Sequence, residues 1–200
     1  KPPVTRPRTK SSCEIIAIGS STGGPQALST VLRTLPKTVR VPIVIVQHMP
    51  PVFTHHLAER LNQESQLTVK EAQQGDTLQP GHVYIAPGDY HMQLRREGTA
   101  VKTVLSQGPP ENSCRPAVDV LFRSVASLGP AAVGVILTGM GQDGLRGCQS
   151  VREAGGQVVV QDEASSVVWG MPGAVAHAGL AHFILPLREI ATKEIGRAHV

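Results

Sequence analysis

Three side chains of the types used in nucleophilic acyl transfer each follow a short apolar run. Ser21 lies in GSSTGG after EIIAI, His48 in QHMPP after VPIVIV, and Asp143 in TGMGQDG after AAVGVIL. A serine hydroxyl becomes a good nucleophile when a base removes its proton, and a histidine base works best when a carboxylate fixes its tautomer. The three residues therefore predict a nucleophile, a base and an orienting carboxylate.

The spacing around Ser21 suits this chemistry. Residues 19–23 read G-x-S-x-G between an expected strand and an expected helix, a pattern that lifts a hydroxyl out of a sheet. The helix that begins at Gly24-Pro25 would present free N–H groups able to stabilise an oxyanion.

Each residue taken alone also has a simpler interpretation. The turn GSSTGG is compatible with a phosphate loop or an ordinary turn. His48 could be a strand-end histidine bonded to backbone, and Asp143 could be the N-cap of a helix that starts near Gly144. The hypothesis of catalysis depends on the three side chains occurring together at strand ends.

The rest of the pattern predicts how these loops are positioned. Apolar runs at 14–18, 41–46, 131–137, 157–161 and near HFIL alternate with helical periodicities. The helices are expected after Pro25, around Phe53, Leu57 and Leu61, over 118–125, over about 144–154, near 173–178 and at the end. We expect an α/β fold with three layers and a mostly parallel, doubly wound sheet, plus an antiparallel hairpin region at about 68–106. Sites in such sheets form beyond the carboxyl ends of the strands.

Other acidic residues are assigned structural places. Asp89 is expected in a turn, Asp119 at a solvated helix position, and Asp162 and Glu163 at a helix cap. His55 and His56 are adjacent on a helix and cannot face one metal ion together, so no metal site is expected.

Nucleotide binding finds little support. The turn at 19–24 lacks G-x-G-x-x-G, the second strand ends in Gln47-His48 where an acid would hold a ribose, and there is no P-loop pattern. A non-catalytic anion-binding module stays open.

Composition excludes further classes. Four basic residues, Lys1, Arg6, Arg8 and Lys10, lie in the first twelve, and the remaining chain has 15 basic and 15 acidic residues. This balance and the 3% aromatic content argue against a nucleic-acid binder. No apolar stretch approaches the length of a membrane span.

We expect residues 1–12 to be an interdomain linker, and 13–200 to be one domain. Its three cysteines, Cys13, Cys114 and Cys148, are expected to be reduced thiols of a cytoplasmic protein.

Six blocks in order resemble the catalytic domain of CheB-type chemotaxis methylesterases. They are IAIGSSTGGPQAL, VQHMPP with FTHHLAERLN, GHVYIAPGDYHMQL, RPAVDVLFRSVA, GVILTGMGQDG and EASSVVWGMPGAV, spanning about Ile15 to Leu187. The resemblance implies a protein-glutamate methylesterase that acts on chemoreceptor helices and also deamidates selected glutamines.

The same resemblance implies roles for individual residues. It makes Ser21 the nucleophile, His48 the base and Asp143 the third member, with Met140 as a backbone oxyanion donor and Thr22 giving a supporting hydrogen bond. No metal or organic cofactor is implied. Family members usually carry an N-terminal receiver domain, phosphorylated by a chemotaxis histidine kinase, and these 200 residues do not include it. Two alternatives stay open: a serine hydrolase of this fold with another ester substrate, and a non-catalytic receptor-binding or anion-binding module.

Overall fold

The computed structural model describes residues 13–195, so the expected linker at 1–12 lies outside the described residues. The strands are β1 (Ile15–Ser20), β2 (Ile43–Gln47), β3 (Thr68–Glu71), β4 (His82–Ile85), β5 (His91–Glu97), β6 (Ala100–Ser106), β7 (Ala132–Ile136), β8 (Gln157–Gln161) and β9 (Phe183–Leu185). The helices are α1 (Gly24–Thr34), α2 (Phe53–Glu64), α3 (Val118–Ala126), α4 (Leu145–Glu153), α5 (Met171–His177), α6 (Leu187–Glu189) and the π-helix η1 (Ile190–Ile195).

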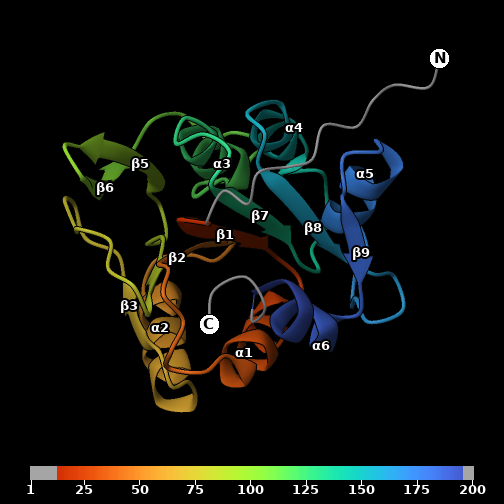
Figure 1. Ribbon diagram of the computed structural model, residues 1–200, viewed down its shortest axis with the longest axis horizontal. Coiled ribbons are helices and arrows are strands. Elements are labelled where there is room, and N and C mark those ends of the chain that lie inside the picture. Colours follow the sequence, from red (N-terminus) through yellow and green to blue (C-terminus); the bar gives the residue numbers. More distant parts are fainter. Residues whose placement is uncertain (1–12, 196–200) are drawn as a thin grey trace.

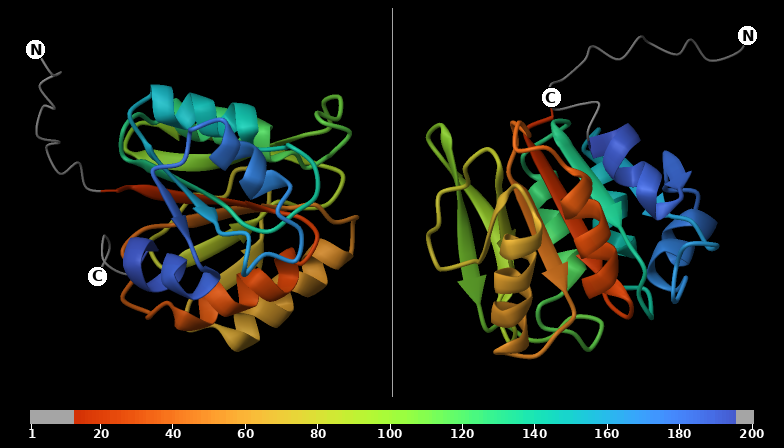
Figure 2. Two further views of the ribbon diagram at one scale, coloured as in Figure 1. Left: turned by 90° about the vertical axis from the view of Figure 1, so that its right-hand side faces the viewer. Right: turned by 90° about the horizontal axis from the view of Figure 1, so that it is seen from below.

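Seven strands form one parallel sheet in the order β3-β4-β2-β1-β7-β8-β9. Helices cover both faces (Figures 1 and 2): α1, α2 and α6 lie on one side, and α3, α4 and α5 on the other. The predicted three-layer, doubly wound α/β fold is confirmed.

Alternate residues of each strand build two separate cores. In β1, Ile16 and Ile18 pack with α1 and α2, whereas Ile15 and Ala17 pack with α3 and α4. A strand buried on both faces reads as a continuous apolar run, because neither side chain direction points to water. This explains the uninterrupted runs in the sequence.

The region 68–106 is antiparallel only in part. Strands β5 and β6 form the expected hairpin, with His91 opposite Ser106, but β3 and β4 are parallel members of the main sheet. The alternation expected for the run HVYI is absent, and Tyr84 in β4 lies in the core. Its ring is buried among apolar residues, and its hydroxyl bonds the backbone of Thr77 and Gln79, so a residue that looks polar lies within the core.

Helix α2 also departs from its expected pattern. Leu57 and Leu61 are buried as predicted, but Phe53 at the first helical position is 60% exposed. In this first turn Thr54 is the buried residue, and its hydroxyl donates to Glu71 and accepts the N–H of Gly88.

The direction of chain winding reverses beside β1. Strand β2 follows β1 on one side through α1, while β7 pairs with β1 on its other side and leads into α4 on the opposite face. The chain therefore switches from one face of the sheet to the other beside β1, and open α/β sheets commonly place their sites at the carboxyl ends of strands next to such a switch. Within residues 13–195, no helix is long and apolar enough to cross a membrane.

Candidate active site

Ser21, His48 and Asp143 lie in the loops that follow β1, β2 and β7, at the carboxyl ends of these three strands. Ser20 is paired with Gln47 across β1 and β2, so Ser21 and His48 leave the sheet side by side, and the His48 N–H donates to the Ser20 carbonyl at 3.1 Å. The loop after β7 joins them because the N–H of Ser21 donates to the carbonyl of Thr138 at 3.0 Å.

The turn after β1 depends on two glycines. Gly23 has a φ of +80°, a conformation that residues with a Cβ rarely adopt. A Cβ on Gly24 would lie 1.9 Å from Oε1 of Gln47. The turn can therefore close tightly over the end of β2.

His48 and Asp143 form a direct pair. The Nε2 atom of His48 lies 2.7 Å from Oδ2 of Asp143, which is almost completely buried. Burial acts to raise the pKa of Asp143, but the hydrogen bonds from His48 and from the N–H groups of Asp119 and Val118 outweigh it and hold that pKa below its ordinary value. An ionised carboxylate only accepts hydrogen bonds, so the hydrogen lies on Nε2 and Nδ1 of the neutral ring keeps its lone pair.

Ser21 follows the strand next to that of His48, and its hydroxyl is not bonded to the His48–Asp143 pair. Among the described residues no protein group is hydrogen-bonded to Ser21 Oγ. Catalytic hydrogen bonds are often long or unformed without substrate, so the absence of this bond does not argue against a Ser21–His48 pair.

Asp143 does not cap the helix that follows it, which was the simpler alternative. Its Oδ2 accepts the N–H of Val118 at 2.7 Å, and its Oδ1 accepts the N–H of Asp119 at 3.0 Å. The carboxylate therefore lies at the N-terminus of α3, where unpaired N–H groups favour a negative charge.

Asp119 was predicted to be a solvated helix residue, and this is wrong. It is 2% exposed, and its Oδ1 accepts the N–H groups of Gly144 and Gly147 at the start of α4. Thus Asp119 of α3 caps the start of α4, and Asp143, just before α4, caps the start of α3. Asn112 joins the two carboxylates, since its Nδ2 donates to Asp119 at 2.8 Å and to Asp143 at 2.9 Å.

Gln47 is the main positioning residue that the sequence analysis missed. Its buried side-chain amide donates to the carbonyl of Ser21 at 2.9 Å and to the carbonyl of His48 at 3.2 Å. Its Oε1 accepts the hydroxyl of Ser20 at 2.6 Å. The available signal was a polar residue closing an otherwise apolar strand directly before His48.

Thr22 and Met140 flank the site from two loops. Both side chains are exposed, and no hydrogen bond of the Thr22 hydroxyl is found among the described residues. In the same part of the chain, the backbone N–H groups of Thr22 and Met140 have no protein acceptor. The N–H of Gly24, in contrast, is bonded to the Ser21 carbonyl at 2.8 Å, and Pro25 has none, so neither of the first two residues of α1 is a free donor.

Exposed apolar side chains lie in the loops around these residues. Val52 and Phe53 follow the His48 loop, Met140 belongs to the loop after β7, and Val167 lies close to Gly23. We call these four residues the apolar rim. Val52 is strained, because its φ of +73° and ψ of −46° are unusual for a β-branched residue.

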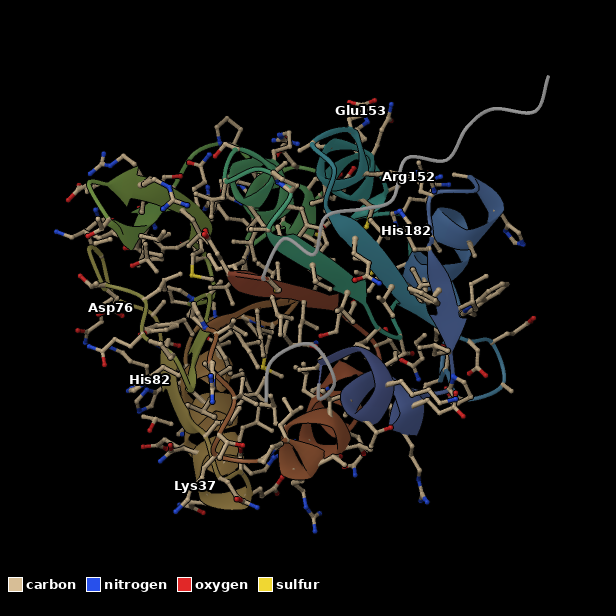
Figure 3. The ribbon with its side chains drawn as sticks, in the orientation of Figure 1. Lys37, Asp76, His82, Arg152, Glu153 and His182 are labelled. Carbon is tan, nitrogen blue, oxygen red and sulfur yellow. The ribbon has the colours of Figure 1, made fainter. Side chains whose placement is uncertain are left out.

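Other polar residues lie elsewhere. Asp89 is in a turn, as predicted, and pairs with Arg115. His55 and His56 each approach Glu59 on the exposed side of α2. Among the titratable side chains labelled in Figure 3, His82 begins β4, His182 directly precedes β9 and Arg152 is near the end of α4. They lie toward the edge of the sheet where its strands begin, away from Ser21.

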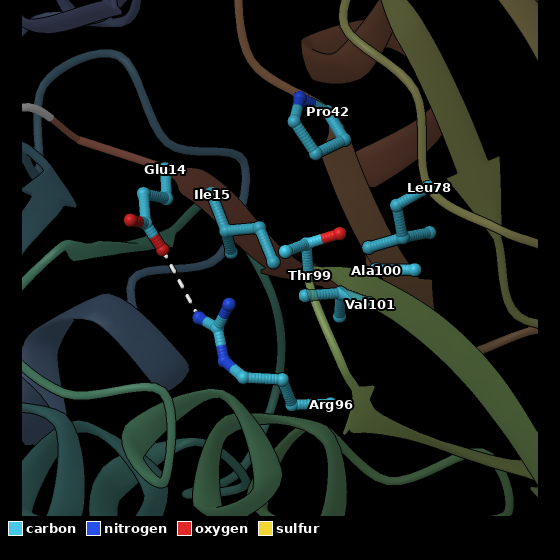
Figure 4. Close-up of a pocket in the computed structure, with 8 residues that line it drawn as sticks. All are labelled: Glu14, Ile15, Pro42, Leu78, Arg96, Thr99, Ala100 and Val101. Atoms are coloured by element: carbon cyan, nitrogen blue, oxygen red, sulfur yellow. Dashed lines mark hydrogen bonds and ion pairs between the residues drawn. The ribbon is translucent and has the colours of Figure 1, made fainter.

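A hollow between β1 and the hairpin is also remote from the site (Figure 4). Its lining includes Ile15, Val101 and the ion pair of Glu14 with Arg96 at 3.1 Å. Ile15 is the first residue of β1 and Ser21 follows the last, so the hollow opens at the opposite edge of the sheet.

Comparisons with known proteins agree with this geometry. The family model described as CheB methylesterase matches residues 16–193. A protein-glutamate methylesterase/protein-glutamine glutaminase of Trichodesmium erythraeum is 64% identical over 92% of this chain and 53% of its own length. One of the same name from Maricaulis maris is 55% identical over 99% of this chain and 50% of its own. The chain thus spans about half the length of these curated relatives. The crystal structure of the Thermotoga maritima CheB methylesterase catalytic domain superimposes with a TM-score of 0.90 at 45% identity, covering 93% of this chain and 99% of that one.

Proposed function

Because the chain belongs to the CheB methylesterase family, we propose that it hydrolyses γ-glutamyl methyl esters on chemoreceptors to glutamate and methanol. The observation that carries the proposal is the His48–Asp143 pair at 2.7 Å, which leaves Nδ1 with its lone pair on the residue that follows β2, next to Ser21 at the end of β1. The names of the relatives describe the same reaction on protein glutamate.

Ser21 acts as the nucleophile and His48 as the base. The Ser21 hydroxyl loses its proton to Nδ1 of His48 while Oγ attacks the ester carbonyl. His48 becomes a cation and is stabilised by Asp143, whose carboxylate is fixed by the start of α3. The proton then passes to the leaving methoxide, and methanol departs from the acyl-enzyme.

The free N–H groups of Thr22 and Met140 bind the oxyanion. They belong to two loops that meet at Ser21, through the hydrogen bond from the Ser21 N–H to Thr138. One such donor contributes about 3–4 kcal/mol to transition-state stabilisation in comparable sites.

Water completes the cycle by attacking the acyl-enzyme with His48 again as base, which releases glutamate and restores Ser21. Selected receptor glutamines react in the same way, with ammonia leaving in place of methanol. Every step uses side-chain and backbone groups of the chain, so the reaction needs no metal or organic cofactor.

The partner is a helix of the receptor's cytoplasmic part, and the apolar rim supplies the surface on which it docks. A methylated glutamate side chain presented on that helix would enter between Met140 and the His48 loop. The reaction takes place in the cytoplasm. Residues 13–200 form the catalytic unit, residues 1–12 act as a linker, and a receiver domain phosphorylated by a chemotaxis histidine kinase regulates access in the whole protein.

Methanol release from methylated receptor membranes tests the proposal, with small generic esters as competing substrates. We expect rapid release from the receptor and little hydrolysis of the small esters. Release must disappear in a folded Ser21→Ala variant. Preference for small esters would identify a different hydrolase, and receptor binding without hydrolysis would identify a binding module.

A further inference from the structure

Cys114 lies against the histidine of the candidate site. It closes a tight turn with Glu111, in which each N–H donates to the other's carbonyl, just before α3. Its Sγ atom is 3.7 Å from Nδ1 of His48 and also donates to the carbonyl of Asn112 at 3.3 Å. The thiol therefore faces the ring nitrogen that keeps its lone pair.

The distance between these two atoms fits shared coordination of a metal ion. With Zn–N near 2.0–2.1 Å and Zn–S near 2.3 Å, two ligands at a tetrahedral angle are separated by about 3.5 Å. The 3.7 Å between Nδ1 and Sγ is close to this value. Ligand atoms of His48, Cys114 and Asp143 all lie within 4.8 Å of one another.

Asp143 would support the histidine in this arrangement and would not bind the metal itself. Its oxygens already accept hydrogen bonds from His48, Val118, Asp119 and Asn112. A histidine that binds a metal through one nitrogen commonly donates its other N–H to a carboxylate, which orients the ring and increases its basicity. The contact of Nε2 with Asp143 supplies this support.

We propose that Nδ1 of His48 and Sγ of Cys114 bind a soft divalent cation, Zn²⁺ or Cd²⁺, with water completing the coordination. Imidazole and thiolate select such ions over Mg²⁺ or Ca²⁺. The thiol releases its proton to solvent on binding, and the thiolate and the Asp143 carboxylate together balance the two positive charges. With only two protein ligands, binding is reversible and weaker than at a four-ligand structural site.

Metal binding would inhibit hydrolysis, and this part of the inference rests on the proposed function. The ion occupies the lone pair that accepts the proton of Ser21. Inhibition is therefore expected to follow occupancy of the site, with saturating Zn²⁺ lowering methanol release at least tenfold.

A thiol redox switch is the competing role for Cys114, and its surroundings argue against it. Burial and the nearby Asp143 carboxylate raise the pKa of the Cys114 thiol. Oxidation needs a thiolate before the oxidant arrives, whereas a bound cation itself draws the proton from the thiol that coordinates it.

The test uses Cd²⁺ added to the metal-free protein in a buffer without thiol reductants or chelators. The readout is the ultraviolet charge-transfer absorption of a cadmium–thiolate bond. We expect one equivalent to bind, loss of the band in Cys114→Ser, and at least tenfold weaker binding in His48→Gln. Cys13→Ser is the matched control, since Cys13 is another half-buried cysteine at the opposite end of β1.

The outcomes separate the site from the proposed function. A band that follows Cys13, survives in Cys114→Ser or is unchanged in His48→Gln would overturn the proposal. Zn²⁺ should inhibit the wild type and spare Cys114→Ser, with each protein's methanol release compared with its own rate without Zn²⁺; equal fractional inhibition of both would also overturn it. Cd²⁺ binding at Cys114 in a protein without esterase activity would support the metal site and refute the proposed function.

Discussion

Replacing Gln47 by methionine tests how the two reacting side chains are held together. Methionine keeps the length and unbranched shape of glutamine but removes three hydrogen bonds, to the carbonyls of Ser21 and His48 and from the hydroxyl of Ser20. At about 1 kcal/mol for each bond, the free energy of unfolding should fall by about 3 kcal/mol.

The larger effect is expected on turnover. A displacement of about 1 Å between reacting groups can lower a rate about 100-fold. Since the amide of Gln47 joins the backbone of Ser21 to that of His48, we expect a loss of this size in kcat with little change in KM. Methanol release measures the kinetics, and urea denaturation measures stability.

Thr103→Val provides the matched control. The buried Thr103 hydroxyl donates to Gln73 at 2.6 Å and accepts from Asp76 at 3.0 Å, in the hairpin away from the site. Its removal should lower stability by about 2 kcal/mol and leave kcat unchanged. The reasoning about Gln47 is refuted if Gln47→Met is destabilised as expected but turns over like the wild type.

Three further substitutions test the surroundings of the site. Val52→Gly should raise the unfolding free energy by about 1 kcal/mol, because relief of the strained φ of +73° outweighs the added backbone entropy; an unchanged or lower melting temperature would contradict this. Asp119→Ala should lower the free energy of unfolding, measured by urea denaturation, by about 3 kcal/mol, since the N–H groups of Gly144 and Gly147 lose their buried acceptor. A loss under about 1 kcal/mol would show that water replaces the carboxylate. The pKa of Asp143 is lower in the folded protein than its ordinary value of 3.8, so its stabilisation is present above that value and is lost as pH falls through the folded pKa. Asp143→Asn should therefore lose less stability than the wild type as pH falls below 3.8, and parallel pH curves would refute this assignment.

The strands of the sheet, and the polar loops that follow them, could be predicted because both depend on local sequence patterns. Apolar runs such as AAVGVIL are buried on both faces, and polar loops follow them at one edge of the sheet. The parallel pairing of β4 could not be read in the same way. A short run such as HVYI fits either a hairpin or a parallel strand, and the neighbour that decides between them is β2, far away in the sequence.

The surroundings of the candidate site were less predictable for a related reason. Ser21, His48 and Asp143 follow strands, so their meeting at one edge follows from topology. Asp119 and Asn112 reach the site through the packing of α3 beside α4, which no sequence spacing reveals. Cys114 approaches His48 only because the turn at 111–114 folds over the end of β2.

Covalent labelling tests the central claim most directly. A fluorophosphonate reacts with a serine whose hydroxyl is activated by a base, and peptide mass spectrometry distinguishes Ser21 from its neighbour Ser20, which donates to Gln47. The account predicts one label per chain, on Ser21, formed at least 100-fold more slowly in a folded His48→Gln variant. Labelling of Ser20 or Cys114, or labelling of Ser21 that does not depend on His48, would contradict it.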